Sequence, residues 1–309
     1  METLIPILAA AVRSGTPILY ATLGEIVTEK AGIMNIGLEG IMLMGALTGF
    51  SATLSTGRPW LGLSAAFAVG ACLGLIHAFL SVTLGSNQVV CGLAMTMFGG
   101  GASALMGRNQ VGMTIKGMAP LDIPVLSELP ILGRVFFSQD IMVYISFILV
   151  FFLVFFLRCT RPGMDLRAVG DNPRAADAMG LPVARIRCTY AILGAGLVAL
   201  GGAYMSVVYN KFWAESMTAG RGWIAVAMVI FAVWNPMRAA LGAYLFGGVD
   251  AFQLRLQAAG TSVPTPLLMM LPYILTILVL VFISIGKGRK ISLSAPSALG
   301  VPFYREERD

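Results

Sequence analysis

The sequence predicts an all-α polytopic membrane protein with about nine transmembrane helices. Of its 309 residues, 57% are hydrophobic and only 12% are charged, whereas soluble domains average about 25% charged residues. The mean hydropathy is +0.83. Apolar stretches of roughly 20 residues, the length that crosses a bilayer core, recur along the whole chain. We therefore treat residues 1–309 as a single transmembrane domain.

The expected spans follow from hydropathy, and polar, glycine- or proline-containing segments separate them. The spans are residues 4–23, 36–54, 60–84, 89–106, 141–157, 189–208, 223–233, 239–252 and 267–285. The seventh and eighth are short, so either could be a re-entrant hairpin. The polar segment 107–139 contains three prolines and is expected to be an external loop. Glycines cluster in three spans, where they favour close helix packing: Gly99, Gly100, Gly101, Gly194, Gly196, Gly201, Gly202, Gly242, Gly247 and Gly248.

The distribution of Lys and Arg predicts the orientation. Most of these residues fall on one side if the basic loop 158–188 and the basic tail 286–309 are both cytoplasmic. The N-terminus is then outside and the C-terminus inside.

Several classes of function are excluded by what the sequence lacks. The net charge of +6 is explained by the positive-inside bias, and no basic stripe with interleaved aromatic residues indicates nucleic-acid binding. The chain contains no P-loop, nucleophile elbow or HExxH motif, and its four cysteines form no CxxC pair. We therefore expect no enzyme, no metal site and no cofactor in this chain, and we expect no disulfide framework.

Four ionisable residues within the expected spans are candidates for function, because such residues are rare in membranes. They are Arg13, Glu39, His77 and Asp250. Arg13 is either a structural partner of a carboxylate such as Glu39 or part of a transport path. His77 stands alone on an apolar helix, which favours a packing role over a proton relay. Asp250 is explained by a position near the outer end of its helix.

The segment 24–40, GEIVTEKAGIMNIGLEG, combines four glycines with charged and amide side chains. It is either a connecting loop or a broken helix, whose ends would present unpaired backbone groups to a polar ligand.

The basic loop 158–188 carries six arginines against three aspartates. Within it, Asn172 can cap a short helix that has Pro173 in its first turn. Gly180 ends this helix, and Pro182 follows. A short amphipathic helix on the cytoplasmic face of a membrane protein indicates a soluble partner there.

Three stretches carry a family resemblance: LGEIVTEKAGIMNIGLEGIMLMGA at residues 23–46, GMDLRAVGDNPRAADAMGL at 163–181, and GRGWIAVAMVIFAVWNP at 220–236. The chain resembles the permease subunits of ABC importers of the ribose and branched-chain amino acid type, and most closely the subgroup that serves nucleosides. The resemblance implies an ABC importer permease bundle, a nucleoside substrate and a location in the plasma (inner) membrane of a bacterium.

The resemblance also implies partners. They are an ATP-binding cassette subunit, a second permease subunit in a homo- or heterodimer, an extracytoplasmic substrate-binding protein and the membrane lipid. The helix in 158–188 would be the coupling helix that docks on the ATPase. Its expected contact residues are Asp165, Arg167, Ala168, Gly170, Asp171, Asn172, Pro173, Arg174, Ala175, Ala176, Met179 and Gly180. The residues expected to line the substrate path are Asn35, Glu39, Asn87, Gln88, Phe98 and Trp234.

Other functions stay open at this point. The wider family also handles simple sugars and branched-chain amino acids. An ion-coupled secondary transporter would use Glu39, His77 and Asp250, and a non-transporting scaffold would use only the basic loop.

Overall fold

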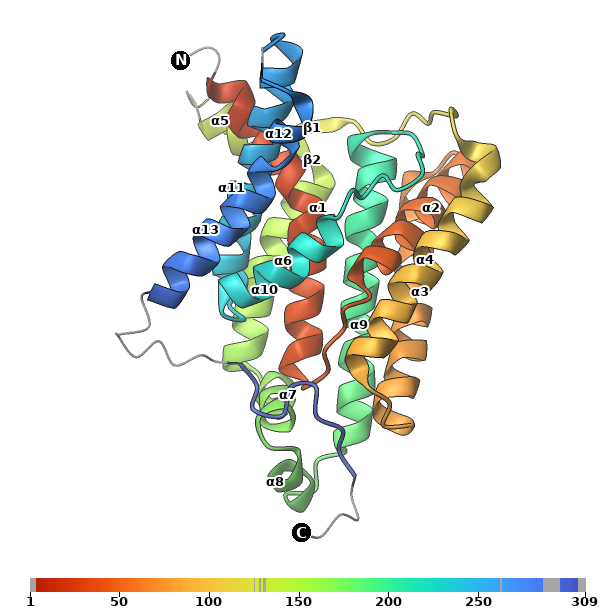
Figure 1. Ribbon diagram of the computed structural model, residues 1–309, viewed down its shortest axis with the longest axis vertical. Helices are drawn as coiled ribbons and strands as arrows, with labels where there is room; N and C mark the ends of the chain where they lie inside the picture. Colours follow the sequence, from red (N-terminus) through yellow and green to blue (C-terminus); the bar gives the residue numbers. More distant parts are fainter. Residues whose placement is uncertain are drawn as a thin grey trace.

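The computed structural model describes residues 4–124, 126, 127, 129, 132–261, 263–285 and 295–304 as a helical bundle (Figure 1). The expected basic tail is covered only at 295–304, and residues 286–294 and 305–309 lie outside the described part. The elements in chain order are α1 (Leu4–Lys30), α2 (Leu38–Thr56), α3 (Pro59–Ala78), η1 (Phe79–Thr83), α4 (Gln88–Gly107), η2 (Arg108–Gln110), β1 (Pro120–Asp122), α5 (Leu132–Phe136), β2 (Ser138–Asp140), α6 (Ile141–Cys159), α7 (Arg161–Asp171), α8 (Pro173–Ala178), α9 (Val183–Ala203), η3 (Tyr204–Tyr209), α10 (Arg221–Ala232), α11 (Pro236–Ala258), α12 (Thr265–Met269) and α13 (Leu271–Ile285).

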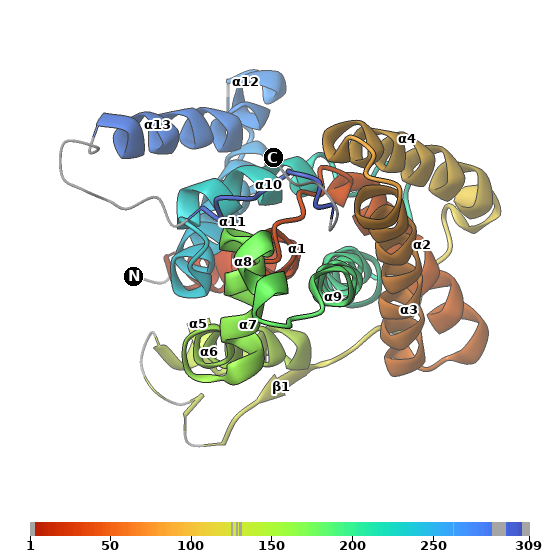
Figure 2. The same cartoon turned by 90° about the horizontal axis from the view of Figure 1, so that it is seen from below.

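The bundle is built from two halves that run in opposite directions. In Figure 1, α1 descends and α2 rises, whereas α9 rises and α10 descends. The contacts repeat in the same way, because α1 packs against α10 and α11 while α9 packs against α2 and α3. Viewed from below, α9 lies between α1 and α3 (Figure 2). The two long helices α1 and α9, which also contact each other, therefore form the centre of the bundle.

Glycine explains how these helices approach so closely, as the sequence predicts. A methyl group at Gly24 of α1 would collide with the carbonyl oxygen of Gly194 in α9. A methyl group at Gly247 of α11 would likewise collide with the carbonyl oxygen of Ala11. Without a side chain the two backbones come into direct contact, which lipid alone would not drive. Two of the predicted packing glycines, Gly100 and Gly101, instead face open space.

Five of the described helices are long and apolar enough to cross a membrane by length and composition: residues 38–56, 59–83, 88–110, 141–159 and 183–209. The central helix α1 is long enough, but it carries charged residues. The helix α10 has 12 residues, so at 1.5 Å per residue it is about 18 Å long. Because a bilayer core is about 30 Å thick, α10, at the seventh expected span, is shorter than that core. The eighth corresponds to α11, a continuous helix of 23 residues.

The polar segment 24–40 is interrupted only briefly. The helix α1 continues through Glu25 and Glu29 to Lys30, and only residues 31–37 are non-helical before α2 begins. The segment is thus a long helix followed by a short, largely buried connection.

The expected external loop 107–139 contains the small antiparallel sheet β1–β2, which pairs Pro120 with Asp140, and the short helix α5.

Candidate functional site

The N-terminal ends of α2 and α10 meet inside the bundle, and Glu39 joins them. Its side chain is only 9% exposed. One carboxylate oxygen accepts hydrogen bonds from Thr218 Oγ1 at 2.6 Å and from the amide of Gly220 at 2.9 Å. The other accepts from the amide of Gly222 at 2.7 Å. A carboxylate at this place satisfies amides that a helix start leaves unpaired, and its negative charge matches the positive end of the α10 dipole.

A second polar cluster lies at the lower end of α1. It contains Glu25 and Glu29, which are one helical turn apart on the same face of the helix. Glu25 Oε1 accepts from the amide of Asn35 at 2.8 Å, and Asn35 Oδ1 accepts from the amide of Gly37 at 2.9 Å. Glu29 Oε2 accepts from Trp234 Nε1 at 2.6 Å, in the turn between α10 and α11. These bonds connect α1 to the start of α2 and to the end of α10.

The structure gives the partners of Arg13, Asp250 and His77, three of the ionisable residues within the expected spans. The predicted pairing of Arg13 with Glu39 is wrong, because Arg13 Nε donates to Gln139 Oε1 at 2.8 Å. Asp250 forms an ion pair with Arg221 at 2.7 Å. His77 is fully buried, and its Nε2 lies 3.1 Å from the carbonyl oxygen of Met34, which agrees with a packing role.

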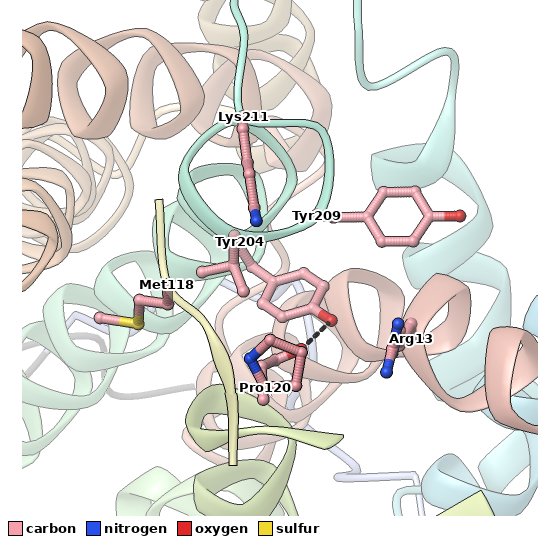
Figure 3. A pocket seen from close by; sticks show the side chains of 8 residues that line it. Arg13, Met118, Pro120, Tyr204, Tyr209 and Lys211 are labelled. Atoms are coloured by element: carbon pink, nitrogen blue, oxygen red, sulfur yellow. Dashed lines mark hydrogen bonds between the residues drawn. The ribbon is translucent and has the colours of Figure 1, made fainter. Parts of the chain in front are cut away.

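A small cavity of about 150 Å³ lies at the end of the bundle opposite α7 and α8. Figure 3 shows Arg13, Lys211 and the rings of Tyr204 and Tyr209 around it. Tyr204 donates to Asp140 Oδ2 at 2.9 Å, and burial raises the pKa of Asp140 above its ordinary value. The cavity thus combines two cations, two phenols and one buried carboxyl group.

The basic loop folds into two helices at the other end of the bundle (Figure 1). Asn172 caps α8 as expected, because its Oδ1 accepts from the amide of Ala175 at 3.0 Å, and Pro173 is in the first turn. Gly180 follows at a φ of +84°, where glycine is favoured. The preceding helix α7 was not predicted. Its signal is Thr160 before Pro162: Thr160 Oγ1 accepts from the amide of Gly163 at 3.2 Å and caps this helix.

The expected coupling residues divide between two faces of α7 and α8. Gly170 and Ala176 are buried against the rest of the chain, where Ala176 packs with Val169 and Val183. Neither residue is therefore available to a partner. The exposed residues are Ala168, Asp171, Asn172, Arg174, Ala175, Met179 and Gly180, and Asp165, Arg167 and Pro173 are half-buried.

The six residues expected to line a substrate path differ in their surroundings. Asn35, Gln88, Glu39 and Trp234 are buried and hold backbone or side-chain groups in place. Asn87 caps α4, and Phe98 is 57% exposed on the surface of the same helix. The cavities beside Arg13, Arg221, Asp171 and Phe156 are lined by other residues than these six.

The structure adds residues that the sequence reasoning missed. Glu25 and Glu29 could have been found from the sequence, because two charged residues four positions apart are rare in a membrane helix. The segment 295–304, which returns to α7, carries no such signal.

Comparisons with known proteins agree with this architecture. The family described as branched-chain amino acid transport system, permease component, matches residues 7–280. A Haloferax volcanii protein provisionally named glucose ABC transporter permease protein TsgC13 is 39% identical over 97% of this chain and 98% of its own length. The guanosine ABC transporter permease protein NupQ of Bacillus subtilis is 33% identical, covering 100% of this chain and 99% of its own. The nucleoside ABC transporter permease protein NupC of Lactococcus lactis is 31% identical over 99% of both chains.

The fold also has a solved counterpart. The chain aligns with an inward-facing structure of a provisionally assigned metal-chelate type ABC transporter at a TM-score of 0.50 and 14% identity, covering 90% of this chain and 85% of the other. At that identity the likeness concerns the fold alone. Together with the match over residues 7–280 and the full-length relatives, it leads to one conclusion: the chain belongs to the permease family of branched-chain amino acid-type ABC transport systems and is a multi-pass permease subunit.

Proposed function

We propose that this chain is the permease subunit of an ATP-driven importer of nucleosides. The observation that carries the substrate class is the full-length similarity to two permeases named for guanosine and for nucleosides, at 33% and 31% identity. A nucleoside is uncharged, so its path requires hydrogen-bond partners and aromatic surface more than fixed charge.

A sugar is the second candidate. It is favoured by the 39% identity to the relative provisionally named for glucose. Both substrates are neutral and rich in hydroxyl groups, so the polar groups described above serve either.

The basic end of the bundle is proposed to face the cytoplasm and to dock on a separate ATP-binding subunit. The docking surface consists of the exposed residues of α7 and α8 together with Asp165, Arg167 and Pro173. Met179 supports this assignment because its apolar side chain is 84% exposed at the tip of the molecule. Exposed apolar side chains rimmed by charge are typical of protein interfaces.

The path is proposed to run between this chain and a second permease subunit. Half-helix ends in the middle of a membrane present backbone groups to a passing solute, and the paired starts of α2 and α10 have this geometry. Glu39, Asn35, Gln88 and Trp234 hold these ends in position. Asn87 and Phe98 remain candidates for direct contact because they are exposed on α4. An extracytoplasmic binding protein would deliver the substrate at the end near Arg13 and Lys211.

The transport step follows from rigid-body motion. When ATP closes the nucleotide-binding subunits, the docked α7 and α8 move with them and shift α6 and α9, to which they are covalently joined. Because packed helices have discrete arrangements, such a shift alternates access to the two sides of the membrane.

The test is uptake into proteoliposomes that contain the permease, its ATP-binding subunit and its binding protein. We expect ATP-dependent accumulation of labelled guanosine that excess unlabelled adenosine inhibits more strongly than glucose or leucine. Stronger inhibition by glucose would favour the sugar. Uptake that survives ATP depletion and is lost with a protonophore would refute the ATP-driven function.

A charge-reversed variant tests the docking surface. Arg167→Glu with Arg174→Glu should lower uptake at least tenfold, which corresponds to about 1.4 kcal/mol, while the protein still inserts into the membrane. The matched control is Arg108→Glu with Arg134→Glu, which makes the same charge change at exposed positions near the opposite end. Normal uptake by the first variant would refute the docking assignment.

A further inference from the structure

Residues 295–304, here called the terminal strap, return to the coupling end of the bundle and connect elements that are distant in sequence. The amide of Ala298 donates to the carbonyl oxygen of Gly170, the penultimate residue of α7, at 3.0 Å. The amide of Gly300 donates to the carbonyl oxygen of Gly32, in the connection between α1 and α2, at 3.2 Å. Two residues of the strap thus bridge α7 to the connection that follows α1.

Side chains fix the strap on both sides of these hydrogen bonds. Phe303 packs against the buried cluster of Val169, Ala176 and Val183, which belong to α7, α8 and α9. Leu299 packs against the main hydrophobic core. The Tyr304 hydroxyl lies against Gly85 in the turn between α3 and α4. A cavity of about 320 Å³ separates part of the strap from the start of α8.

Arg187 of α9 lies beneath the strap and is 1% exposed. Its Nη1 donates to the carbonyl oxygen of Val301 at 3.0 Å, whereas its Nε and Nη2 have no hydrogen-bond partner among the described residues. Its guanidinium also borders Gly32. Burying a cation is costly unless it is well paired, so this arginine is not explained by stability alone. Its position, where α9, the strap and the α1–α2 connection meet, indicates a positioning role.

The strap reinforces a joint of the bundle that is not covalent. The coupling helices are covalently joined to α6 and α9, but not to α1. At Gly170, α7 abuts the carbonyl oxygen of Lys30 at the end of α1, because a methyl group there would collide with it. Asp171 of α7 also lies close enough to Lys30 for their opposite charges to attract. The two hydrogen bonds of the strap reinforce this joint, so that it resists a pull as well as a push. The connection after α1 continues through Asn35 to the start of α2.

We propose that the terminal strap and Arg187 tie the coupling helices to the α1–α2 connection, so that movement of α7 and α8 moves α1 and α2 in both directions. This inference rests on the proposed function, in which α7 and α8 dock on an ATP-binding subunit. Arg187 is a positioning residue that acts through Val301, and Phe303 is the apolar anchor of the strap.

The experiment measures coupling, not binding. Wild-type complex and variants are reconstituted in proteoliposomes, and both [³H]guanosine uptake and ATP hydrolysis are measured, together with the amount of ATP-binding subunit retained by the permease. The variants are a chain that ends at Ser294, Phe303→Asp and Arg187→Met. The matched controls are a chain that ends at Tyr304, which keeps the strap, Phe303→Leu, which stays apolar, and Arg187→Lys, which keeps a donor for Val301.

We expect each variant to retain its ATP-binding subunit and to hydrolyse ATP, while the guanosine imported per ATP falls at least roughly fivefold, the lower end of typical coupling effects. The controls should stay within about twofold of the wild type. An unchanged ratio in Phe303→Asp and Arg187→Met would overturn the proposal. Loss of the ATP-binding subunit from these two variants would also overturn it, since the strap would then be a docking or folding element. Failure of the proposed function is recognised separately, because the wild-type complex itself would then show no ATP-driven uptake of guanosine, glucose or leucine.

Discussion

Replacing Glu39 with glutamine tests whether this carboxylate holds the start of α10. The substitution keeps the size of the side chain but removes the charge and one acceptor. The oxygen that accepts from Thr218 and Gly220 can be retained. The amide nitrogen of glutamine then faces the amide of Gly222, and two donors oppose each other.

The cost follows from two contributions. A buried amide left without an acceptor loses about 1–3 kcal/mol. Removing a negative charge from a helix N-terminus costs about 0.3–1 kcal/mol, and up to about 2 kcal/mol in a partly buried site. We therefore expect the local stability of the α10 start to fall by about 2–4 kcal/mol.

Amide hydrogen exchange in detergent measures this local stability, because exchange reports the free energy of local opening. A loss of about 2–4 kcal/mol corresponds to roughly 30- to 1000-fold faster exchange at Gly220 and Gly222. The matched control is Glu215→Gln, at an exposed glutamate of the same 210–220 connection, where we expect a change of less than about 0.5 kcal/mol. Exchange in Glu39→Gln that accelerates less than about threefold would refute the reasoning.

Two further predictions concern stability in detergent. Gly99→Ala should lower the thermal midpoint by an amount equivalent to about 1–3 kcal/mol, because the added methyl group would collide with the backbone of Gly40. The control is Gly101→Ala on the same helix, which faces open space and should be neutral. Equal midpoints for the two variants would contradict this prediction. Burial raises the pKa of Asp140, so the folded state holds the carboxyl proton more tightly than the unfolded state does. The resulting stabilisation is present at low pH and weakens as pH rises through the raised pKa. As pH rises from about 4, the ordinary pKa of an aspartate, thermal midpoints of the wild type should therefore fall more than those of Asp140→Asn. Asp122→Asn is the exposed control. Parallel pH profiles for wild type and Asp140→Asn would show that Asp140 does not titrate in this way.

Much of the fold could be predicted because its signals are local. Hydropathy located the long helices, and Asn172, Pro173 and Gly180 marked α8, since caps and breakers act within one turn of the backbone. The basic loop stood out for the same reason, because charge is conspicuous in an otherwise apolar chain. The motifs at residues 23–46, 163–181 and 220–236 were enough to indicate the family that the comparisons confirm.

The candidate site could be predicted only in part. The sequence identified Glu39 and Trp234 as polar or aromatic residues in apolar surroundings, but it assigned both to the lining of a path. Their partners, Thr218 and Glu29, lie 179 and 205 residues away in the chain. Periodicity carries no information about such pairs, so the roles of these residues as helix ties could not be derived.

The sequence by itself determined that this chain is a membrane protein, where most of its long helices lie, and which loop is rich in arginine. These properties depend on the transfer of side chains into lipid and on backbone groups satisfied within one segment. Only the tertiary structure decided that Glu39 binds the start of α10, that Arg13 is bound to Gln139 and not to Glu39, and that residues 295–304 close over α7. Those outcomes depend on contacts between residues that lie more than 100 positions apart in the chain, which local patterns of hydropathy and charge do not encode.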